Sequence, residues 1–62
     1  MPFYRIYCLD DAGRISLADW IDARSDDDAI GKARKIAHGA RMCEVWQKDR
    51  LIALFKNHEL VG

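Results

Sequence analysis

Two cysteines and two histidines are the residues of this sequence best suited to nucleophilic, redox or metal chemistry. A thiol next to an imidazole forms an activated nucleophile, and Cys8 or Cys43 beside His38 or His58 would provide such a pair. However, the sequence has no C-x-x-C motif and no second pair of ligands at zinc spacing. We therefore expect two buried thiols, and we expect no catalytic residue, cofactor or metal.

Two aspartate clusters raise the question of a cation site, because carboxylates are ligands that Ca²⁺ prefers. They are residues 10–11 in the segment DDAG and residues 26–28 in the segment SDDDAI. DDAG lacks the alternating ligands and the closing glutamate of a calcium loop. We interpret the first cluster as a turn and the second as the N-terminus of a helix.

Four basic residues could form a nucleic-acid surface with aromatic side chains, because bases stack on aromatic rings and phosphates attract cations. The basic residues are Lys32, Arg34, Lys35 and Arg41, and the aromatic ones are Trp46 and Tyr4 or Tyr7. The formal net charge of the chain is zero, and the helical bases would lie away from the aromatic face. Nucleic-acid binding is therefore our alternative hypothesis.

Alternating apolar residues predict two strands ahead of the helix. In the first, Tyr4, Ile6 and Cys8 alternate with Phe3, Arg5, Tyr7 and Leu9. The second covers the segment RISLADWIDA, in which Trp20 does not share the parity of the other apolar residues. We expect a bulge near residues 18–20, and the sequence leaves open which face of the sheet Trp20 occupies.

The segment SDDDAIGKARKIAHGA has the composition and spacing of a helix. Ser25 is expected to cap its first turn, and Asp28 imitates the glutamate of a capping box. Gly39 is expected at the end of the helix. The apolar stripe is mostly alanine, so this helix can lie close to a sheet.

The segment MCEVWQKDRLIALF, residues 42–55, predicts a β-hairpin with its turn at residues 48–49. A two-residue connection pairs Trp46 with Leu51, Val45 with Ile52 and Met42 with Phe55. Both faces of this hairpin are then apolar. One face carries Cys43, Val45, Ile52 and Leu54, and the other carries Met42, Trp46, Leu51, Ala53 and Phe55, with Glu44 among them.

The order β-β-α-β-β predicts an α+β fold with a four-stranded antiparallel sheet in the spatial order 2-1-3-4. One helix packs on one face of this sheet. We expect a single domain over residues 1–62, with an ordered core at about 3–56 and a flexible tail at 57–62. The residues expected beneath the helix are Ile6, Cys8, Val45, Ile52 and Leu54.

The second face of the sheet has no element of the chain to cover it, and so large an apolar patch exceeds what monomers usually expose. The interface candidates on this face are Tyr7, Leu9, Met42, Trp46, Leu51 and Phe55. A second copy or an unidentified protein partner would cover them, and sheet-to-sheet packing in a symmetric dimer is the simplest arrangement. A dimer would also stabilise a chain of 62 residues, a length that rarely builds a sufficient core alone.

The sequence predicts a cytoplasmic protein without a membrane segment. Its longest uncharged run, residues 51–55, is too short to span a bilayer. The first residues, MPFYRIYCLD, include an arginine and an aspartate and lack the apolar region of a signal peptide.

Three stretches carry a resemblance to known proteins: LDDAG, SDDDAI followed by KAR, and CEVWQKDRLIA. Across about residues 3–56 the chain resembles short bacterial proteins of β-β-α-β-β layout. The resemblance implies the fold and a bacterial cytoplasmic setting, and it implies no activity, cofactor or catalytic residue. Our leading hypothesis is a non-enzymatic protein-interaction module that homodimerises through the helix-free sheet face. The alternative is a small nucleic-acid-binding or regulatory protein that uses the basic helix face.

Overall fold

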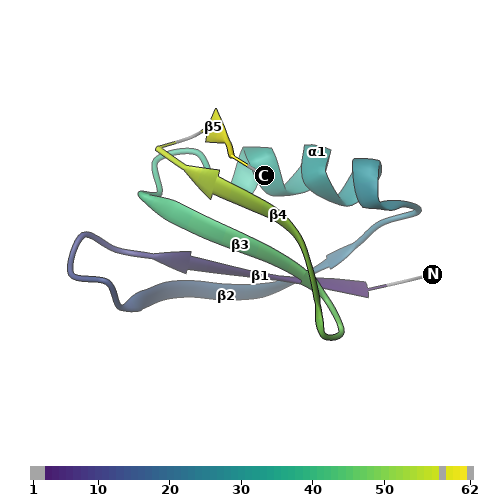
Figure 1. Ribbon diagram of the computed structural model, residues 1–62, viewed down its shortest axis with the longest axis horizontal. Helices are drawn as coiled ribbons and strands as arrows, with labels where there is room; N and C mark the ends of the chain where they lie inside the picture. Colours follow the sequence, from purple (N-terminus) through teal and green to yellow (C-terminus); the bar gives the residue numbers. More distant parts are fainter. Residues whose placement is uncertain (1–2, 58, 62) are drawn as a thin grey trace.

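The computed structural model describes residues 3–57 and 59–61 and contains one helix beside a single sheet (Figure 1). The elements in chain order are β1 (Phe3–Leu9), β2 (Ile15–Asp22), α1 (Asp26–Ile36), β3 (Met42–Gln47), β4 (Arg50–Lys56) and β5 (Glu59–Leu60). The predicted α+β class and the β-β-α-β-β order of the first five elements are confirmed. Within the described residues, no helix has the length and apolar character needed to cross a membrane.

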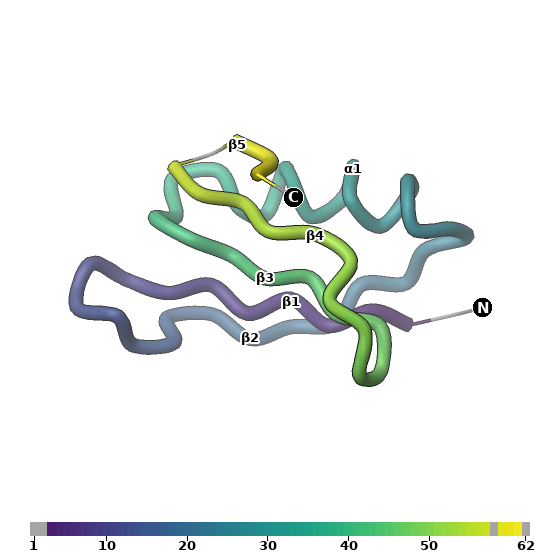
Figure 2. The backbone as a smooth tube through the Cα atoms, in the orientation of Figure 1, coloured from purple at the N-terminus to yellow at the C-terminus, as the bar shows by residue number. Residues whose placement is uncertain are grey.

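The sheet is antiparallel throughout and has the strand order β2-β1-β3-β4-β5. The predicted order 2-1-3-4 is therefore correct, but a fifth strand extends it. This strand lies within residues 57–62, which we expected to be flexible: Glu59 and Leu60 pair with β4. Asn57, with φ 54°, reverses the chain between these two strands. The β1–β2 and β3–β4 turns lie at opposite ends of the sheet (Figure 2).

The core lies between α1 and one face of the sheet, which we call the helix-covered face. The strands supply its large side chains, and the helix supplies alanines that let it approach the sheet closely. The fully buried residues are Tyr4, Ile6, Cys8, Ile21, Ala23, Ala29, Ala33, Ala37, Cys43, Val45, Ala53 and Phe55. Period-two alternation in β1 thus correctly predicted Ile6 and Cys8 as core residues.

A β-bulge in β4 changes the predicted register of the hairpin. Trp46 pairs with Leu51 as predicted, but Val45 pairs with Ala53 because Ile52 is an extra residue on β4. Beyond the bulge the side chains of β4 change faces, since residues of a strand alternate between its two sides. Ile52 still packs against the core, as predicted. The interface candidate Phe55 instead pairs with Cys43 and is a core residue, 1% exposed.

The same change of register places Leu54 on the face opposite to the one we predicted. We expected Leu54 beneath the helix, but it pairs with Glu44 and lies on the helix-free face. The predicted pairs of Val45 with Ile52 and of Met42 with Phe55 are therefore wrong. Met42 pairs with Lys56.

Strand β2 also contains a bulge, but not where we expected it. The pairing with β1 is regular from Asp22 to Leu17 and shifts at Ser16, near the turn. The hydroxyl of Ser16 donates to the backbone oxygen of Cys8 at 3.2 Å. Because residues 18–20 stay in register, Trp20 faces away from the helix, opposite Arg5.

A capping network begins helix α1, as the sequence predicted. Oγ of Ser25 accepts the N–H of Asp28 at 3.2 Å, and the carboxylate of Asp28 accepts the N–H of Arg24 at 3.0 Å. This backbone hydrogen bond, together with Lys32, lowers the pKa of Asp28 below its ordinary value. The helix ends at Ile36, and Gly39, with φ 87°, turns the chain towards β3.

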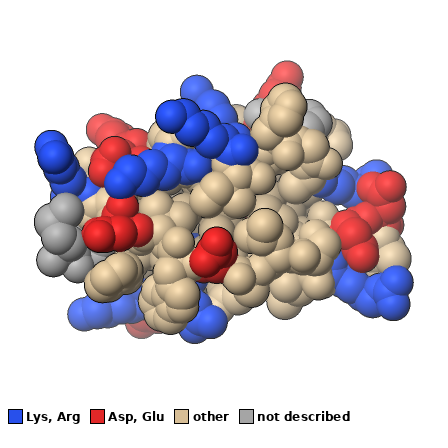
Figure 3. All heavy atoms as spheres, turned by 180° about the vertical axis from the view of Figure 1, so that it is seen from behind, with Lys and Arg blue, Asp and Glu red and all other residues tan. Residues whose placement is uncertain are grey.

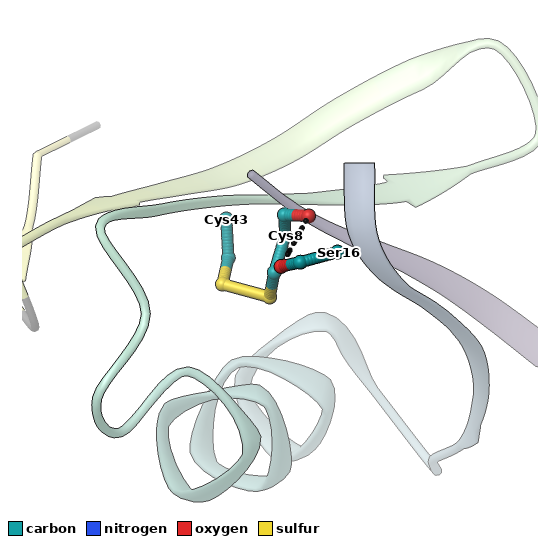
Figure 4. The surroundings of a disulfide bond; sticks show 3 residues. All are labelled: Cys8, Ser16 and Cys43. Atoms are coloured by element: carbon teal, nitrogen blue, oxygen red, sulfur yellow. Dashed lines mark hydrogen bonds between the residues drawn. A yellow bond between two sulfur atoms is a disulfide. The ribbon is translucent and has the colours of Figure 1, made fainter. Parts of the chain in front are cut away.

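Cys8 and Cys43 form a disulfide bond across β1 and β3, so the expectation of two buried thiols was wrong (Figure 4). The two residues are directly opposite in the strand register, with their Cα atoms 4.0 Å apart. Such a spacing belongs to the closer, non-hydrogen-bonded type of antiparallel pair. The bond is fully buried on the helix-covered face, near α1.

Candidate interaction surface

The sheet surface opposite α1, which we call the open face, has no covering element among the described residues. Strand register assigns its members, because directly opposed residues point to the same side. They are Phe3, Arg5, Tyr7 and Leu9 on β1; Ile15, Ala18, Trp20 and Asp22 on β2; Met42, Glu44 and Trp46 on β3; Leu51, Leu54 and Lys56 on β4; and Glu59 on β5. Most of this surface is apolar, and its charged members include both signs.

Two aromatic rings flank Arg5 on the open face, and a third ring packs against one of them. The Cζ atom of Arg5 lies 4.9 Å from the ring centroid of Trp20 and 5.1 Å from that of Tyr7, which are cation–π distances. Phe3 meets Trp20 edge to face, with ring centroids 6.3 Å apart. Phe3 and Trp20 also line a shallow apolar hollow. They are 57% and 60% exposed, which is unusual for such large apolar side chains.

Glu44 places a carboxylate among these apolar side chains. It lies opposite Tyr7 on one side and Leu54 on the other. Its Oε1 atom accepts the indole N–H of Trp46 at 3.2 Å, which fixes the orientation of both side chains. Glu44 and Trp46 are both half-buried.

The structure brings five of the six predicted interface residues together on the open face. Tyr7, Leu9, Met42 and Trp46 are half-buried there, and Leu51 is exposed. Phe55 is the exception, because the bulge in β4 turns it into the core. A surface built from β1 and β3 was thus predictable from period-two alternation.

The interface candidates predicted from the sequence omitted four members of this surface that matter most for its chemistry: Phe3, Arg5, Trp20 and Glu44. Of these, Glu44 had been placed on this side of the β3–β4 hairpin. For Phe3 and Arg5 the signal was present, because they share the parity of Tyr7 and Leu9 in β1. Trp20 could be placed only through its register with β1.

The four basic candidates for nucleic-acid contacts do not converge with the aromatic side chains. Lys32, Arg34 and Lys35 are exposed on α1, on the other side of the sheet. Two of the four form ion pairs. Nζ of Lys32 lies 3.5 Å from the carboxylate of Asp28, and Nη1 of Arg41 lies 3.7 Å from that of Asp11.

The polar clusters elsewhere have structural roles. Oδ1 of Asp10 accepts the backbone N–H groups of Ala12 and Arg14, which shapes the β1–β2 turn. The buried Tyr4 donates its hydroxyl to Asp26 at 2.7 Å, and this bond raises the pKa of Tyr4 above its ordinary value. Among the described residues no cluster of three or more side chains could hold a metal ion. The disulfide bond joins the sulfur atoms of both cysteines, and His58 lies outside the described residues.

Comparisons with known proteins identify no relative of this chain. No protein-family model matches the chain, and no curated protein and no solved structure matches it significantly. The resemblance to short bacterial proteins therefore stays a prediction. The function of this chain has to be argued from the open face itself.

Proposed function

We propose that this chain is a non-enzymatic protein-interaction module that homodimerises through its open face. The observation that carries the proposal is the aromatic cluster around Arg5. Phe3 and Trp20 are more than half exposed and line one apolar hollow, and Trp46 and Tyr7 continue the apolar surface across β1 and β3. Clustered, exposed large apolar side chains are typical of protein interfaces.

The size of the open face bounds the dimer interface. The molecule measures 33 × 18 × 17 Å, so the product of its two longest extents is about 600 Å² per face. Two faces in complete overlap would bury about 1,200 Å², the lower limit for stable specific interfaces, and crossed faces would bury less, in the range of weak, transient association. Self-association would also stabilise a chain of 62 residues, for which one hydrophobic core is a marginal source of stability.

The charge distribution favours a protein partner over nucleic acid. Acidic and basic side chains lie next to one another at both ends of the molecule, and uncharged residues fill most of the middle of this view (Figure 3). Nucleic-acid binders instead concentrate positive charge on one surface. No specific observation favours the nucleic-acid alternative, and we do not propose it as a second function.

The disulfide bears on the compartment in which this module works. We expected the cytoplasm from the sequence, but disulfides persist mainly in oxidising compartments and are rare where thiols are kept reduced. The bond between Cys8 and Cys43 therefore favours an oxidising compartment.

Light scattering across a dilution series tests self-association. We expect the wild-type chain to have the mass of a dimer, and Trp20→Ser to shift the monomer–dimer equilibrium at least tenfold towards the monomer, since it removes a large exposed apolar contact. Trp20 is 60% exposed and outside the core, so this variant should fold normally.

Leu60→Ser is the matched control. Leu60 is a 44% exposed apolar residue on the edge strand β5, away from the open face, so its replacement should leave the dimer unchanged. A wild-type chain that stays monomeric at high micromolar concentration would contradict the proposal. An equal loss of dimer in both variants would point to a different interface.

A further inference from the structure

Arg5 and Glu44 are opposite charges on neighbouring strands of the open face, yet they do not pair with each other. Across β1 and β3, Arg5 is opposite Trp46 and Tyr7 is opposite Glu44. These four residues form a rectangle in which Arg5 and Glu44 occupy one diagonal, and Tyr7 and Trp46 the other. Diagonal neighbours in a sheet stand about 7–8 Å apart. The ion pairs of the described residues include neither Arg5 nor Glu44.

Both charged side chains are held in place and keep hydrogen-bonding capacity. The rings of Tyr7 and Trp20 position the guanidinium of Arg5 without using its N–H donors. The carboxylate of Glu44 accepts one bond, from Trp46, in the described part of the chain, whereas a carboxylate can accept about four. Each group is therefore prepared to bind an opposite charge that approaches the open face.

We propose that two copies of the chain pack face to face about a two-fold axis that runs roughly along the Tyr7–Trp46 diagonal. This inference rests on the proposed homodimer and specifies its geometry. A rotation about that axis exchanges the two ends of the other diagonal. Arg5 of each protomer then faces Glu44 of the partner subunit, and the symmetry makes this ion pair twice.

The same axis brings the aromatic residues of the other diagonal together. Tyr7 and Trp46 lie close to the axis and so contact their own symmetry mates, as in any two-fold interface. The angle between the strands and the Tyr7–Trp46 diagonal follows from a rise of about 3.4 Å per residue and a strand spacing of about 4.8 Å. The two-fold rotation doubles this angle, so the strands of the two sheets would cross at about 70°, nearer to orthogonal than to aligned sheet packing.

The mixture of charges on the open face favours a second copy of the chain as its occupant. Its charged members are two basic residues, Arg5 and Lys56, and three acidic residues, Asp22, Glu44 and Glu59. A nucleic acid would require an excess of positive charge. A face that carries both signs at neighbouring positions complements a rotated copy of itself. In such an interface the aromatic contacts supply affinity, and the ion pairs fix the register of the two copies.

The test is a charge swap between the two positions. Arg5→Glu alone sets Glu against Glu at both contacts, and Glu44→Arg alone sets Arg against Arg. We expect each single variant to dimerise at least tenfold more weakly than the wild-type chain. Mixing the two variants at equal concentration should restore a heterodimer, because both contacts then join opposite charges. Native mass spectrometry separates this heterodimer from either homodimer by mass.

Controls separate this inference from the proposed function. Lys35→Glu reverses a charge on α1, far from the open face, and should leave the wild-type dimer unchanged. If the wild-type chain is a monomer, the proposed function itself fails. If it is a dimer, but the single variants dimerise normally or their mixture gives no heterodimer, only the two-fold geometry fails. If one single variant does not fold alone, co-expression of both variants tests the same pairing, and heterodimer would support the geometry while its absence would overturn it.

Discussion

At the scale of single residues, the bond between Cys8 and Cys43 joins the two strands at the centre of the sheet. It closes a chain segment with a sequence separation of 35, for which the loss of chain entropy in the unfolded state corresponds to roughly 3–4 kcal/mol. A domain of this length has a total unfolding free energy of roughly 3–9 kcal/mol. The disulfide can therefore supply a large share of the stability.

Reduction of the disulfide should lower the free energy of unfolding by roughly 2–4 kcal/mol. Urea unfolding monitored by tryptophan fluorescence, with and without reductant, measures this change. The double variant Cys8→Ala/Cys43→Ala should resemble the reduced protein and should not respond to the reductant.

The redox state in cells tests the same bond. Acid-quenched protein, alkylated after denaturation, should show both cysteines protected until a reductant is added. Two freely alkylated cysteines, with equal stability in both redox conditions, would contradict a structural disulfide and the oxidising compartment.

At the scale of elements, the N-terminus of α1 is held by side chains that the sequence places within four residues of one another. Ser25 accepts the N–H of Asp28, and Asp28 accepts the N–H of Arg24. The hydrogen bond that the N–H of Arg24 donates to Asp28 is strongest when the carboxylate is ionised. The pKa of Asp28 is therefore lower in the folded than in the unfolded chain. A lowered carboxylate pKa stabilises the fold above the unfolded pKa, and this contribution disappears as the pH falls through the folded pKa.

Asp28→Ala should therefore be less stable than the wild-type chain at pH 7. This difference in stability should become smaller at pH values well below the ordinary pKa of 3.8. Urea unfolding midpoints at pH 7 and at about pH 2 provide the comparison. Asp27→Ala is the matched control, because Asp27 is an exposed acidic residue of the same first turn. A stability difference for Asp28→Ala that is independent of pH would contradict the assigned role of its carboxylate.

The outer strand β2 illustrates a second property of the elements. An unpaired strand edge can recruit another chain by backbone hydrogen bonding. The backbone N–H of Trp20 instead donates to the carboxylate of Asp19 at 2.8 Å, and Asp19 and Asp22 add charge to this exposed strand. These features disfavour edge-to-edge pairing along β2, which is consistent with the proposed use of the open face.

At the scale of the whole molecule, one helix covers one side of a five-stranded sheet, and no described element covers the other side. When a folded dimer unfolds to separate chains, mass action makes the melting temperature depend on concentration. We expect a hundredfold dilution to lower the melting temperature of the wild-type chain by about 10 °C.

Circular dichroism or differential scanning fluorimetry over that concentration range measures the effect. Trp20→Ser should show a much weaker dependence, because its folded state would be mainly monomeric. A wild-type melting temperature that is constant over the range would mean that folding and self-association are not coupled.

The sequence by itself determined the features that depend on short-range order. Alternation in β1 placed Ile6 and Cys8 in the core and Tyr7 on the opposite face, because side chains of a strand alternate between its two sides. Ser25 and Asp28 marked the start of α1, since capping bonds span three residues. The tip of the β3–β4 hairpin was also predictable, and from these elements followed the order of four strands and the existence of an uncovered face.

Only the tertiary structure decided how the strands register and which residues meet. The bulges at Ser16 and Ile52 depend on pairing with strands far away in the sequence, and one inserted residue reverses the face of every side chain beyond it. Phe55 therefore became a core residue, and Trp20 joined the open face. The disulfide likewise depends on the register that sets Cys8 directly opposite Cys43. Local patterns cannot specify such contacts, because they arise only when distant segments pack together.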